Sequence, residues 1–591
     1  MRARSARDLP LKRAGLRGEW LLAPSALRPS GGEHRQADRS VCFVASGTGP
    51  AMWFLTTLMD AWELGSLSMA GTMDRRRFLQ ASAAAVGFAQ INPDFLVSSA
   101  FAQSGKPLVF LSAENITGNW DPTAHTTLSQ KNIEGFVMGF LTRTPMTLDD
   151  PGKVVYELAT DIRLLDPHRL QIKLRKGVQF HDGKPFGPED VKATFEYGAG
   201  KDRPAQWYPG PTETLTITTP DDETVIVDTS KGGYPAHLFI FLASFLPILS
   251  AKDVAEGPGG ALTRRLNGTG PFRFVEQRGN DTVLKAHDGY FRGKPGIPGI
   301  NFTFTGDSTT RMLSLMNGQA SIVERLEPEQ VETVKNNPKI AINEVVSVEN
   351  KYLWFRCSKP PFNDVRVRMA ACHSIDRAML LEILGAAGHA SANFISPVKF
   401  GYVDLKNYPA YDPAKAQALL AEAGFPKGKG LPPLEYITSV GFYPKTKEYG
   451  EVITAMLNEQ GFPVSLTVLE PAAWNERLYH RPGGGPGHMV DCGWSTASPE
   501  PDLVLRTHFH SSSHRITGIE DAQIDASLDK ERAAPTLEER KAILQNETMP
   551  LLAAKMPALS LFTSVMIHAM QQELKGLYIY PDGSIDASKT A

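Results

Sequence analysis

The sequence predicts a soluble α/β protein on three observations. Of its 591 residues, 42 % are hydrophobic and 21 % are charged, which are the proportions of an ordinary globular protein. Short runs typical of strands alternate with stretches typical of helices, as they do in α/β folds. The 62 Lys and Arg balance 64 Asp and Glu, so no strong field favours a polyanionic partner, and we expect no nucleic acid.

Three short runs of residues are typical of β-strands. Residues 107–111, 169–174 and 223–227 are rich in aliphatic and β-branched side chains, and the second run alternates apolar with polar residues as a half-exposed strand does. The apolar run 236–250 contains Pro247 and is too short to span a bilayer. We therefore expect this run to be a buried core element.

Helices are indicated by their end signals. Asp412 stands before Pro413 and a run of helix formers, and Gly424 follows where a C-terminal cap belongs. Asp364 likewise precedes Val365, which predicts a second helix beginning there.

Residues 73–102 have the order of an export signal. The pair Arg75 and Arg76 is followed by an apolar stretch and by a small-residue site that ends at Ala102. The paired arginines resemble a twin-arginine signal, so we expect cleavage after Ala102 and a periplasmic product. Because such signals act at the N-terminus, residues 1–72 are expected to be a disordered, non-native extension ahead of a native start at Met73.

Motifs of common enzymes are missing from the sequence. It contains no G-x-S-x-G elbow, no H-E-x-x-H and no G-x-G-x-x-G after a strand, so we expect no enzyme and no cofactor. His508, His510 and His514 form an H-x-H-x3-H cluster, which is either a transition-metal site or a polar loop.

Six segments of the chain have recognisable motifs. They are residues 170–191, 267–272, 287–295, 360–377, 411–425 and 493–502. In the second of them, a tight turn, Gly268 and Gly270 are expected to adopt positive φ. Together and in this order, the six segments resemble the family 5 (peptide/nickel) solute-binding proteins of ABC importers. One segment alone would carry little weight, but six in the family's order make the resemblance specific.

The resemblance implies a two-lobed periplasmic-binding-protein fold of the class II type, in its large variant with an extra subdomain. Residues 103–345 would form lobe I with that subdomain, residues 346–555 lobe II, and residues 556–591 a return to lobe I. The two crossings, near residues 345–348 and 556–561, would form a hinge. Bound solute would favour closure by its higher affinity for the closed form.

The function that the resemblance implies is non-enzymatic transport. A monomer would capture a medium-sized solute, such as a peptide, an oligosaccharide or a related compound, and deliver it to ABC permease subunits in the cytoplasmic membrane. Two alternatives remain open: a nickel or metal-chelate carrier, and an exported hydrolase on a similar scaffold.

Candidate ligand-binding residues follow from positions that line the cleft in relatives. An aspartate that pairs with the α-amino group of a peptide in relatives falls here on Ala497, which puts a simple α-peptide in doubt. Glu500 is the alternative carboxylate, and Trp207 with Tyr208 is a further candidate. The predicted binding residues are Asn119, Trp120, Asp121, Phe442, Tyr443, Trp494, Ser495, Thr496 and Ala497.

The cysteines allow two interpretations. Of the four in the chain, Cys357, Cys372 and Cys492 lie after the export signal. Cys357 and Cys372 are the nearest pair for a disulfide, but all three could equally be small buried hydrophobic residues, and we favour the latter.

Overall fold

The structure is a computed structural model of the chain. It describes residues 105–116, 120–123, 128–199, 214–257, 259–440, 443–480, 484–494, 496, 498–513 and 515–591. The predicted extension and export signal lie outside these residues. None of the helices in this part of the chain is both long enough and apolar enough to cross a membrane.

A large mixed sheet organises the described residues. Its strand order is β15-β14-β16-β12-β17-β11-β1-β10-β9-β8, with β13 pairing as a branch on β17. β1 is parallel to β10 and β11, β14 is parallel to β15 and β16, and β12 and β17 are antiparallel to their neighbours. The strands are β1 Leu108–Ser112, β8 Phe272–Arg278, β9 Asp281–Ala286, β10 Gly299–Phe304, β11 Ile322–Glu324, β12 Ile340–Phe355, β13 Gly388–His389, β14 Leu434–Ser439, β15 Val464–Leu469, β16 Met489–Trp494 and β17 Ala558–Gln571.

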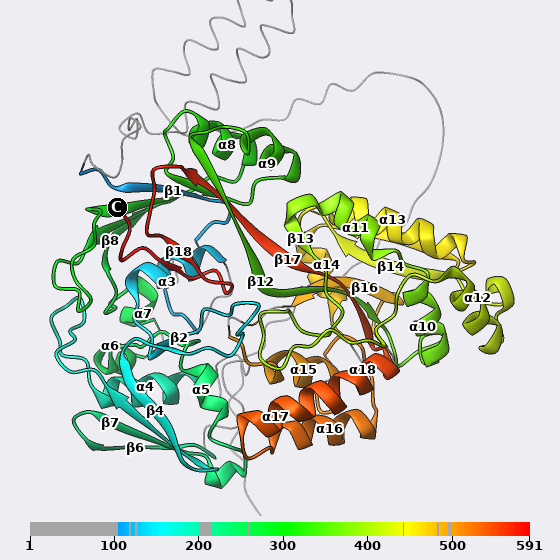
Figure 1. Cartoon of the computed structure of the whole chain (residues 1–591), viewed down its shortest axis with the longest axis horizontal. Coiled ribbons are helices and arrows are strands. Elements are labelled where there is room, and N and C mark those ends of the chain that lie inside the picture. Colours follow the sequence, from blue (N-terminus) through cyan, green and yellow to red (C-terminus); the bar gives the residue numbers. More distant parts are fainter. Residues whose placement is uncertain are drawn as a thin grey trace, which may run out of the picture. The chain divides into compact units, whose positions relative to one another are not determined.

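β12 and β17 form a long antiparallel pair that joins the two halves of this sheet (Figure 1). Residues 340–346 of β12 pair with residues 565–571 of β17, and residues 350–354 pair with residues 558–563. Between these stretches the register shifts, so residues 347–349 bulge out of the ladder. The packing changes at the same place, because Phe562 belongs to the largest hydrophobic core and Val565 packs against another.

A separate four-stranded sheet, in the order β4-β5-β7-β6, packs under its own core. The predicted strands are confirmed as β1, β5 and β7, and the apolar run 236–250 is buried in and beside this core, as expected. The smaller strands are β2 Thr142–Arg143, β3 Val155–Tyr156, β4 Ala159–Asp166, β5 Arg169–Leu174, β6 Thr216–Asp221, β7 Thr224–Asp228, β18 Tyr578–Ile579 and β19 Ile585–Asp586.

The helices begin where the sequence places their caps. The side chain of Asp412 accepts a hydrogen bond from the backbone N–H of Lys415, and Asp364 does the same for Arg366. Gly424 has φ +92°, which only glycine adopts without strain. The helices are α3 Leu128–Val137, α4 Pro188–Gly198, α5 Leu238–Leu242, α6 Ala251–Ala255, α7 Ala261–Arg264, α8 Ser308–Met316, α9 Pro328–Val334, α10 Val365–His373, α11 Arg377–Leu384, α12 Pro413–Glu422, α13 Thr446–Glu459, α14 Pro471–Leu478, α15 Asp502–Phe509, α16 Ala522–Arg532, α17 Leu537–Ile543 and α18 Met549–Lys555.

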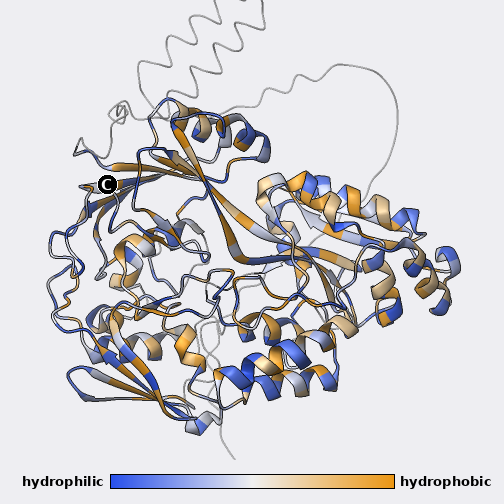
Figure 2. Ribbon diagram, in the orientation of Figure 1, coloured by the Kyte–Doolittle hydropathy of each residue, from blue (hydrophilic) through white to orange (hydrophobic). Residues whose placement is uncertain are grey.

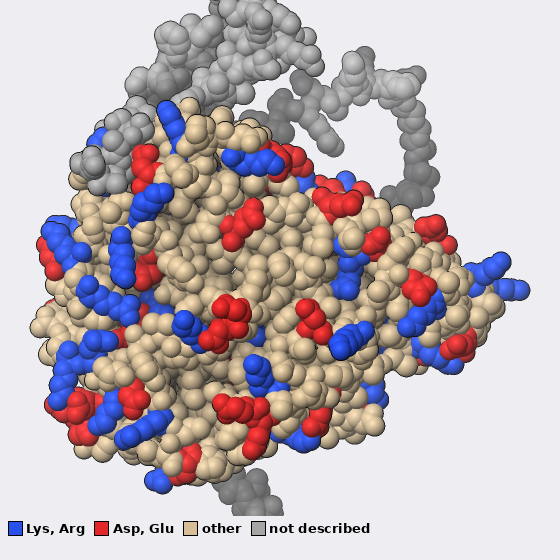
Figure 3. Space-filling model, in the orientation of Figure 1, with Lys and Arg blue, Asp and Glu red and all other residues tan. Residues whose placement is uncertain are grey.

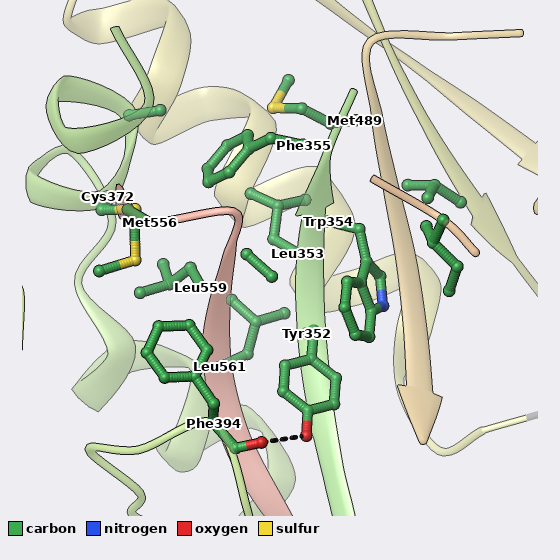
Figure 4. Packing of buried hydrophobic residues seen from close by; sticks show 14 of the residues in the cluster. Tyr352, Leu353, Trp354, Phe355, Cys372, Phe394, Met489, Met556, Leu559 and Leu561 are labelled. Atoms are coloured by element: carbon green, nitrogen blue, oxygen red, sulfur yellow. Dashed lines mark hydrogen bonds between the residues drawn. The ribbon is translucent and has the colours of Figure 1, made fainter. Parts of the chain in front are cut away.

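The largest core lies around the C-terminal part of β12. Trp354 and Tyr352 pack there with rings 4.4 Å apart, and the hydroxyl of Tyr352 donates to the backbone carbonyl of Phe394 at 2.8 Å (Figure 4). Apolar residues line the strands, whereas α16 and α17 carry both polar and apolar residues (Figure 2). The three cysteines of this region are buried and free, which confirms the interpretation as small core residues.

The turn at residues 267–272 corrects one prediction. Neither Gly268 nor Gly270 has positive φ. A methyl group at either position would instead overlap the backbone of Val137 and Met138, which passes directly over the turn. These glycines are required by close packing of two backbones, not by backbone conformation.

Candidate functional site

The carboxyl ends of parallel strands meet at the middle of the large sheet. β1 and β11 are parallel and end at Ser112 and Glu324, whereas β14 and β16 are parallel and end at Ser439 and Trp494. Glu324 pairs with His568 of β17, and Trp494 pairs with Asn350 of β12. Both sets of strand ends therefore adjoin the register shift of the β12–β17 pair. Ligands of α/β proteins bind at such carboxyl edges.

Arg325 and Glu114 supply charge on the β1–β11 side. Their side chains form an ion pair of 2.5 Å, and 42 % of the Arg325 side chain is accessible to solvent. The protein nevertheless surrounds the guanidinium: burial alone would lower its pKa, and the carboxylates of Glu114, Glu324 and Glu349 together raise it. The guanidinium is thus partly accessible to solvent and has carboxylates on several sides.

The backbone at Arg325 supports a special role for this residue. Its φ is +50°, in the left-handed region that costs a non-glycine residue free energy. The strained turn directs the chain away from β11 immediately after the buried Glu324.

Glu349 enters the same region from the bulge of β12. Its carboxylate accepts a hydrogen bond from the Ser564 hydroxyl at 3.3 Å. A methyl group on Gly493 would overlap Oε1 of Glu349, so the missing side chain of Gly493 provides the room in which the carboxylate lies. Burial raises the pKa of Glu349, and the positive charges of Lys351 and Arg325 oppose that rise.

Beneath Tyr443 lies a buried ion pair. The ammonium of Lys351 is 3.2 Å from a carboxylate oxygen of Asp491, and both side chains are 1 % exposed. The same ammonium lies 3.2 Å from the centre of the Tyr443 ring, a cation–π contact. Thr438 and Tyr449 donate to the other oxygen of Asp491 at 3.1 and 2.6 Å. This network fixes the Tyr443 ring at the end of β14.

Trp494 presents a half-buried ring at the end of β16. The guanidinium of Arg515 lies 4.7 Å from its centre, and the ring of His508 packs edge-on at 4.4 Å. The Tyr443 hydroxyl contacts the backbone carbonyl of Gly493 at 3.4 Å, so Tyr443 adjoins the end of β16. We call the set Glu114, Arg325, Glu349, Tyr443 and Trp494 the carboxyl-edge site.

The structure describes five of the nine predicted binding residues. Tyr443 and Trp494 are in the carboxyl-edge site. Trp120 is 3 % exposed and packs on Phe274, and Asp121 accepts hydrogen bonds from Thr123 and Tyr197. Four of the predicted residues lie outside the described residues: Asn119, Phe442, Ser495 and Ala497. The further candidates Trp207 and Tyr208 also lie outside them.

Thr496, also predicted, is described and serves a buried lysine. Lys399 donates to the Thr496 hydroxyl at 2.7 Å and to the Ser498 carbonyl at 2.6 Å. Burial lowers the pKa of Lys399 to about 7. Lys399 thus holds the segment that follows Trp494.

Glu500 does not take the place of the missing aspartate. Its carboxylate is 3 % exposed and accepts two hydrogen bonds from the guanidinium of Arg540, at 2.5 and 2.8 Å. A bidentate pair of this kind occupies both oxygens, so Glu500 is a structural residue.

The histidine cluster is divided by the fold. His508 is fully buried between Trp354 and Trp494, and burial lowers its pKa well below the usual value. His510 instead faces Asp525 and Asp529. His514 lies outside the described residues, and within them no group of three or more His, Cys, Asp or Glu is arranged to hold a metal ion.

Two surface hollows flank the joining strands elsewhere. One of about 610 Å³ lies between α11 and residues 389–404, and one of about 380 Å³ lies between Pro145–Leu148 and the N-terminal part of β12. Neither contains a residue of the carboxyl-edge site. On the face drawn in Figure 3, acidic and basic side chains are interspersed.

Sequence reasoning missed Glu114, Arg325 and Glu349. Two of them stand where an apolar run gives way to a charge, which is a usable signal for a strand end: Glu114 follows Leu108–Ser112, and Arg325 follows Ile322–Glu324. Glu349 had no such signal, because its position depends on the register shift of β12.

Comparison with known proteins identifies relatives of the chain. The sequence profile described as bacterial extracellular solute-binding proteins, family 5 (middle part), matches residues 153–515, more than half of the chain. The dipeptide-binding protein of Escherichia coli is 26 % identical over 439 residues, which are 69 % of this chain and 81 % of that protein. Heme-binding protein A of Haemophilus influenzae is 27 % identical over 443 residues, 69 % of this chain and 79 % of that protein.

Solved structures share the fold. A dipeptide-binding protein from Pseudoalteromonas, crystallised with Met-Leu, superposes with a TM-score of 0.68 at 20 % identity and covers 82 % of this chain and 99 % of its own. The likeness shows the two-lobed α/β architecture that the sequence predicts.

Proposed function

The chain belongs to family 5 of the bacterial extracellular solute-binding proteins, and from this premise we propose that it binds a medium-sized solute at the carboxyl-edge site. The bound solute would be handed to the membrane permease of an ABC importer. The observation that carries the site assignment is the meeting of the β1–β11 ends with the β14–β16 ends beside the β12–β17 pair.

The chemistry of the site supports capture rather than conversion of a solute. It offers two aromatic rings for stacking and both signs of charge for orientation, through Arg325 and Glu349. Among the described residues, the buried histidine next to the site, His508, lies between aromatic rings and is held neutral. We therefore propose that the protein is a non-enzymatic binding protein, and we do not propose His508 as a metal ligand.

The lobe boundaries are proposed from the packing. Residues 103–345 with 556–591 would form lobe I and residues 346–555 lobe II, with the register shift at residues 347–349 as the pivot. Across this boundary, Lys445 at the start of α13 contacts Glu329 of α9 at 2.8 Å. The contact supports a closed arrangement of the proposed lobes.

Export follows from the family, and its route is a further part of the proposal. We infer that residues 73–102 direct the protein through the twin-arginine pathway and that a monomer acts outside the cytoplasm. Replacement of Arg75 and Arg76 by lysine should leave the precursor in the cytoplasm.

A ligand screen tests the function. The purified protein is mixed with Met-Leu, glutathione and haem, and unfolding temperature and binding heat are recorded. A true solute at a hundredfold excess over its Kd adds about 2.7 kcal/mol to the free energy of unfolding. Recovery of the same molecule unchanged after incubation supports binding, whereas its breakdown or the failure of every probe would count against the proposal.

A further inference from the structure

We propose that Glu349 is a specificity-determining residue that binds a positively charged group, such as an ammonium, on the solute. The inference rests on the proposed function, because it names the class of solute that the carboxyl-edge site accepts. It starts from a comparison of the carboxylates that surround this site.

The other carboxylates of the region have strong partners. Asp491 is paired with Lys351 and accepts from Thr438 and Tyr449. Glu324 accepts from the Ser112 hydroxyl at 2.8 Å, the backbone of Ala113 at 2.9 Å and the Asn132 amide at 3.1 Å. Glu114 has its ion pair with Arg325. Their negative charges are satisfied within the protein.

Glu349 differs from them. Of the hydrogen-bond donors in the described part of the chain, the Ser564 hydroxyl at 3.3 Å is its one partner. A carboxylate has about four acceptor positions on two oxygens, so most of this capacity is unused. A partly buried carboxylate with a single weak partner has unused acceptor capacity that a cation can complete.

The bulge in β12 explains why Glu349 has few hydrogen-bond partners. Residues 347–349 leave the ladder between β12 and β17, and the N–H of Glu349 binds the Ser347 side chain at 3.1 Å instead of a neighbouring strand. Bulges of this kind re-aim a side chain. The absent side chain of Gly493 then gives the carboxylate its place against β16.

The neighbouring groups favour a cation of the solute rather than one of the protein. Lys351 is already held by Asp491 and by the Tyr443 ring, and Arg325 by Glu114. The formal charges of Glu114, Arg325 and Glu349 sum to one negative charge.

The test compares matched probes on matched variants. Calorimetry measures the binding of Met-Leu, of N-acetyl-Met-Leu, which has no ammonium, and of N-methyl-Met-Leu, which keeps the charge but adds bulk. The variants are Glu349→Gln and the control Glu344→Gln, an exposed residue of the same strand. Far-ultraviolet circular dichroism and the unfolding temperature confirm that each variant is folded.

We expect the wild type to prefer Met-Leu and N-methyl-Met-Leu over the acetylated probe by more than about tenfold. Glu349→Gln should lose that preference, and Glu344→Gln should keep it. Equal binding of the charged and acetylated probes by the wild type, or an unchanged preference in Glu349→Gln, would overturn the inference and leave the proposed function standing.

The remaining outcomes are also decisive. If the wild type binds haem but none of the three dipeptides, solute binding stands and the role of Glu349 does not. If no probe of the whole panel binds, the inference fails together with the proposed function.

Discussion

At the scale of single residues, the buried pair Lys351–Asp491 is the electrostatic foundation of the site. Each side chain is 1 % exposed, so loss of either partner leaves an uncompensated charge in a low-dielectric interior. The pair also holds the Tyr443 ring through the ammonium of Lys351. Stability and binding are therefore coupled at this point.

Replacement of Lys351 by methionine should destabilise the protein by about 3 kcal/mol, because Asp491 would remain buried without its counter-charge. Urea unfolding measures the loss. The matched control is Lys447→Met, whose partner Glu451 is 3.9 Å away at an exposed position and whose removal should cost less than about 1 kcal/mol. Equal losses in both variants would contradict this account.

Replacement of Trp494 by alanine should weaken solute binding by more than about tenfold, since large aromatic anchors dominate binding energies. The ring is half-buried, so the fold should survive. Trp474→Ala is the contrast: that ring is 4 % exposed in the core, and its loss should cost about 3–5 kcal/mol of stability. Unchanged affinity in calorimetry would remove Trp494 from the site.

The residues of the site differ in how far sequence could predict them. The family resemblance marks Trp494 and Tyr443 as binding residues, and for these two the sequence prediction and the proposed site agree. Glu349, Gly493 and Arg325 meet only through pairing of segments far apart in the chain, and the register shift that aims Glu349 leaves no local pattern.

At the scale of elements, local signals predicted ends well. Asp412 and Asp364 cap their helices as expected, because a capping hydrogen bond reaches only two or three residues along the chain. The prediction of positive φ for Gly268 and Gly270 was wrong, because the constraint on these glycines is not local. Their constraint comes from Val137, more than a hundred residues earlier in the chain.

The turn at residues 267–272 gives a prediction for this scale. Gly268→Ala should destabilise the protein by about 1–3 kcal/mol, because its methyl group would overlap the backbone of Val137 and neither backbone can move freely. Gly187→Ala is the control, since nothing lies within 4 Å of the position of its methyl group. Thermal unfolding measures the stability of both variants. If Gly268→Ala is as stable as the wild type, the two backbones can separate and the prediction is wrong.

At the scale of the whole molecule, buried histidines make the fold sensitive to acid. Burial lowers the pKa of His181 and of His568 to about 4, below the usual value of 6.5. It also lowers those of His237, His287 and His508. In the unfolded chain these imidazoles take up protons as the pH falls through 6.5, whereas the folded protein resists, so folding stability is lost between pH 6.5 and about 4.

Urea unfolding at pH 7.5 and pH 5.0 measures this loss. Glu531, whose pKa burial raises to about 7, and Glu349, whose pKa burial also raises, act in the opposite sense. Burial lowers the pKa of His373 and His488 as well, so seven imidazoles outweigh two carboxyls. His181→Asn should show a smaller loss than the wild type. Equal stability at the two pH values would contradict the prediction.

The proposed function requires that two lobes pivot on β12 and β17 and close around a solute. Glu329 and Lys445 lie on the proposed lobes and touch at 2.8 Å. The Glu329 side chain is 70 % exposed, so the pair contributes little to stability and both residues can be replaced by cysteine. The three thiols in the described part of the chain do not interfere, because they are buried and burial raises the pKa of Cys357 to about 11 and of Cys492 to about 12.

Spin labels on Glu329→Cys and Lys445→Cys then allow the distance between the lobes to be measured by pulsed electron paramagnetic resonance. With the solute found in the ligand screen, the account predicts one short, narrow distance that matches the closed structure. Without solute it predicts a longer and broader distribution. The same distribution in both samples would contradict closure around a captured solute.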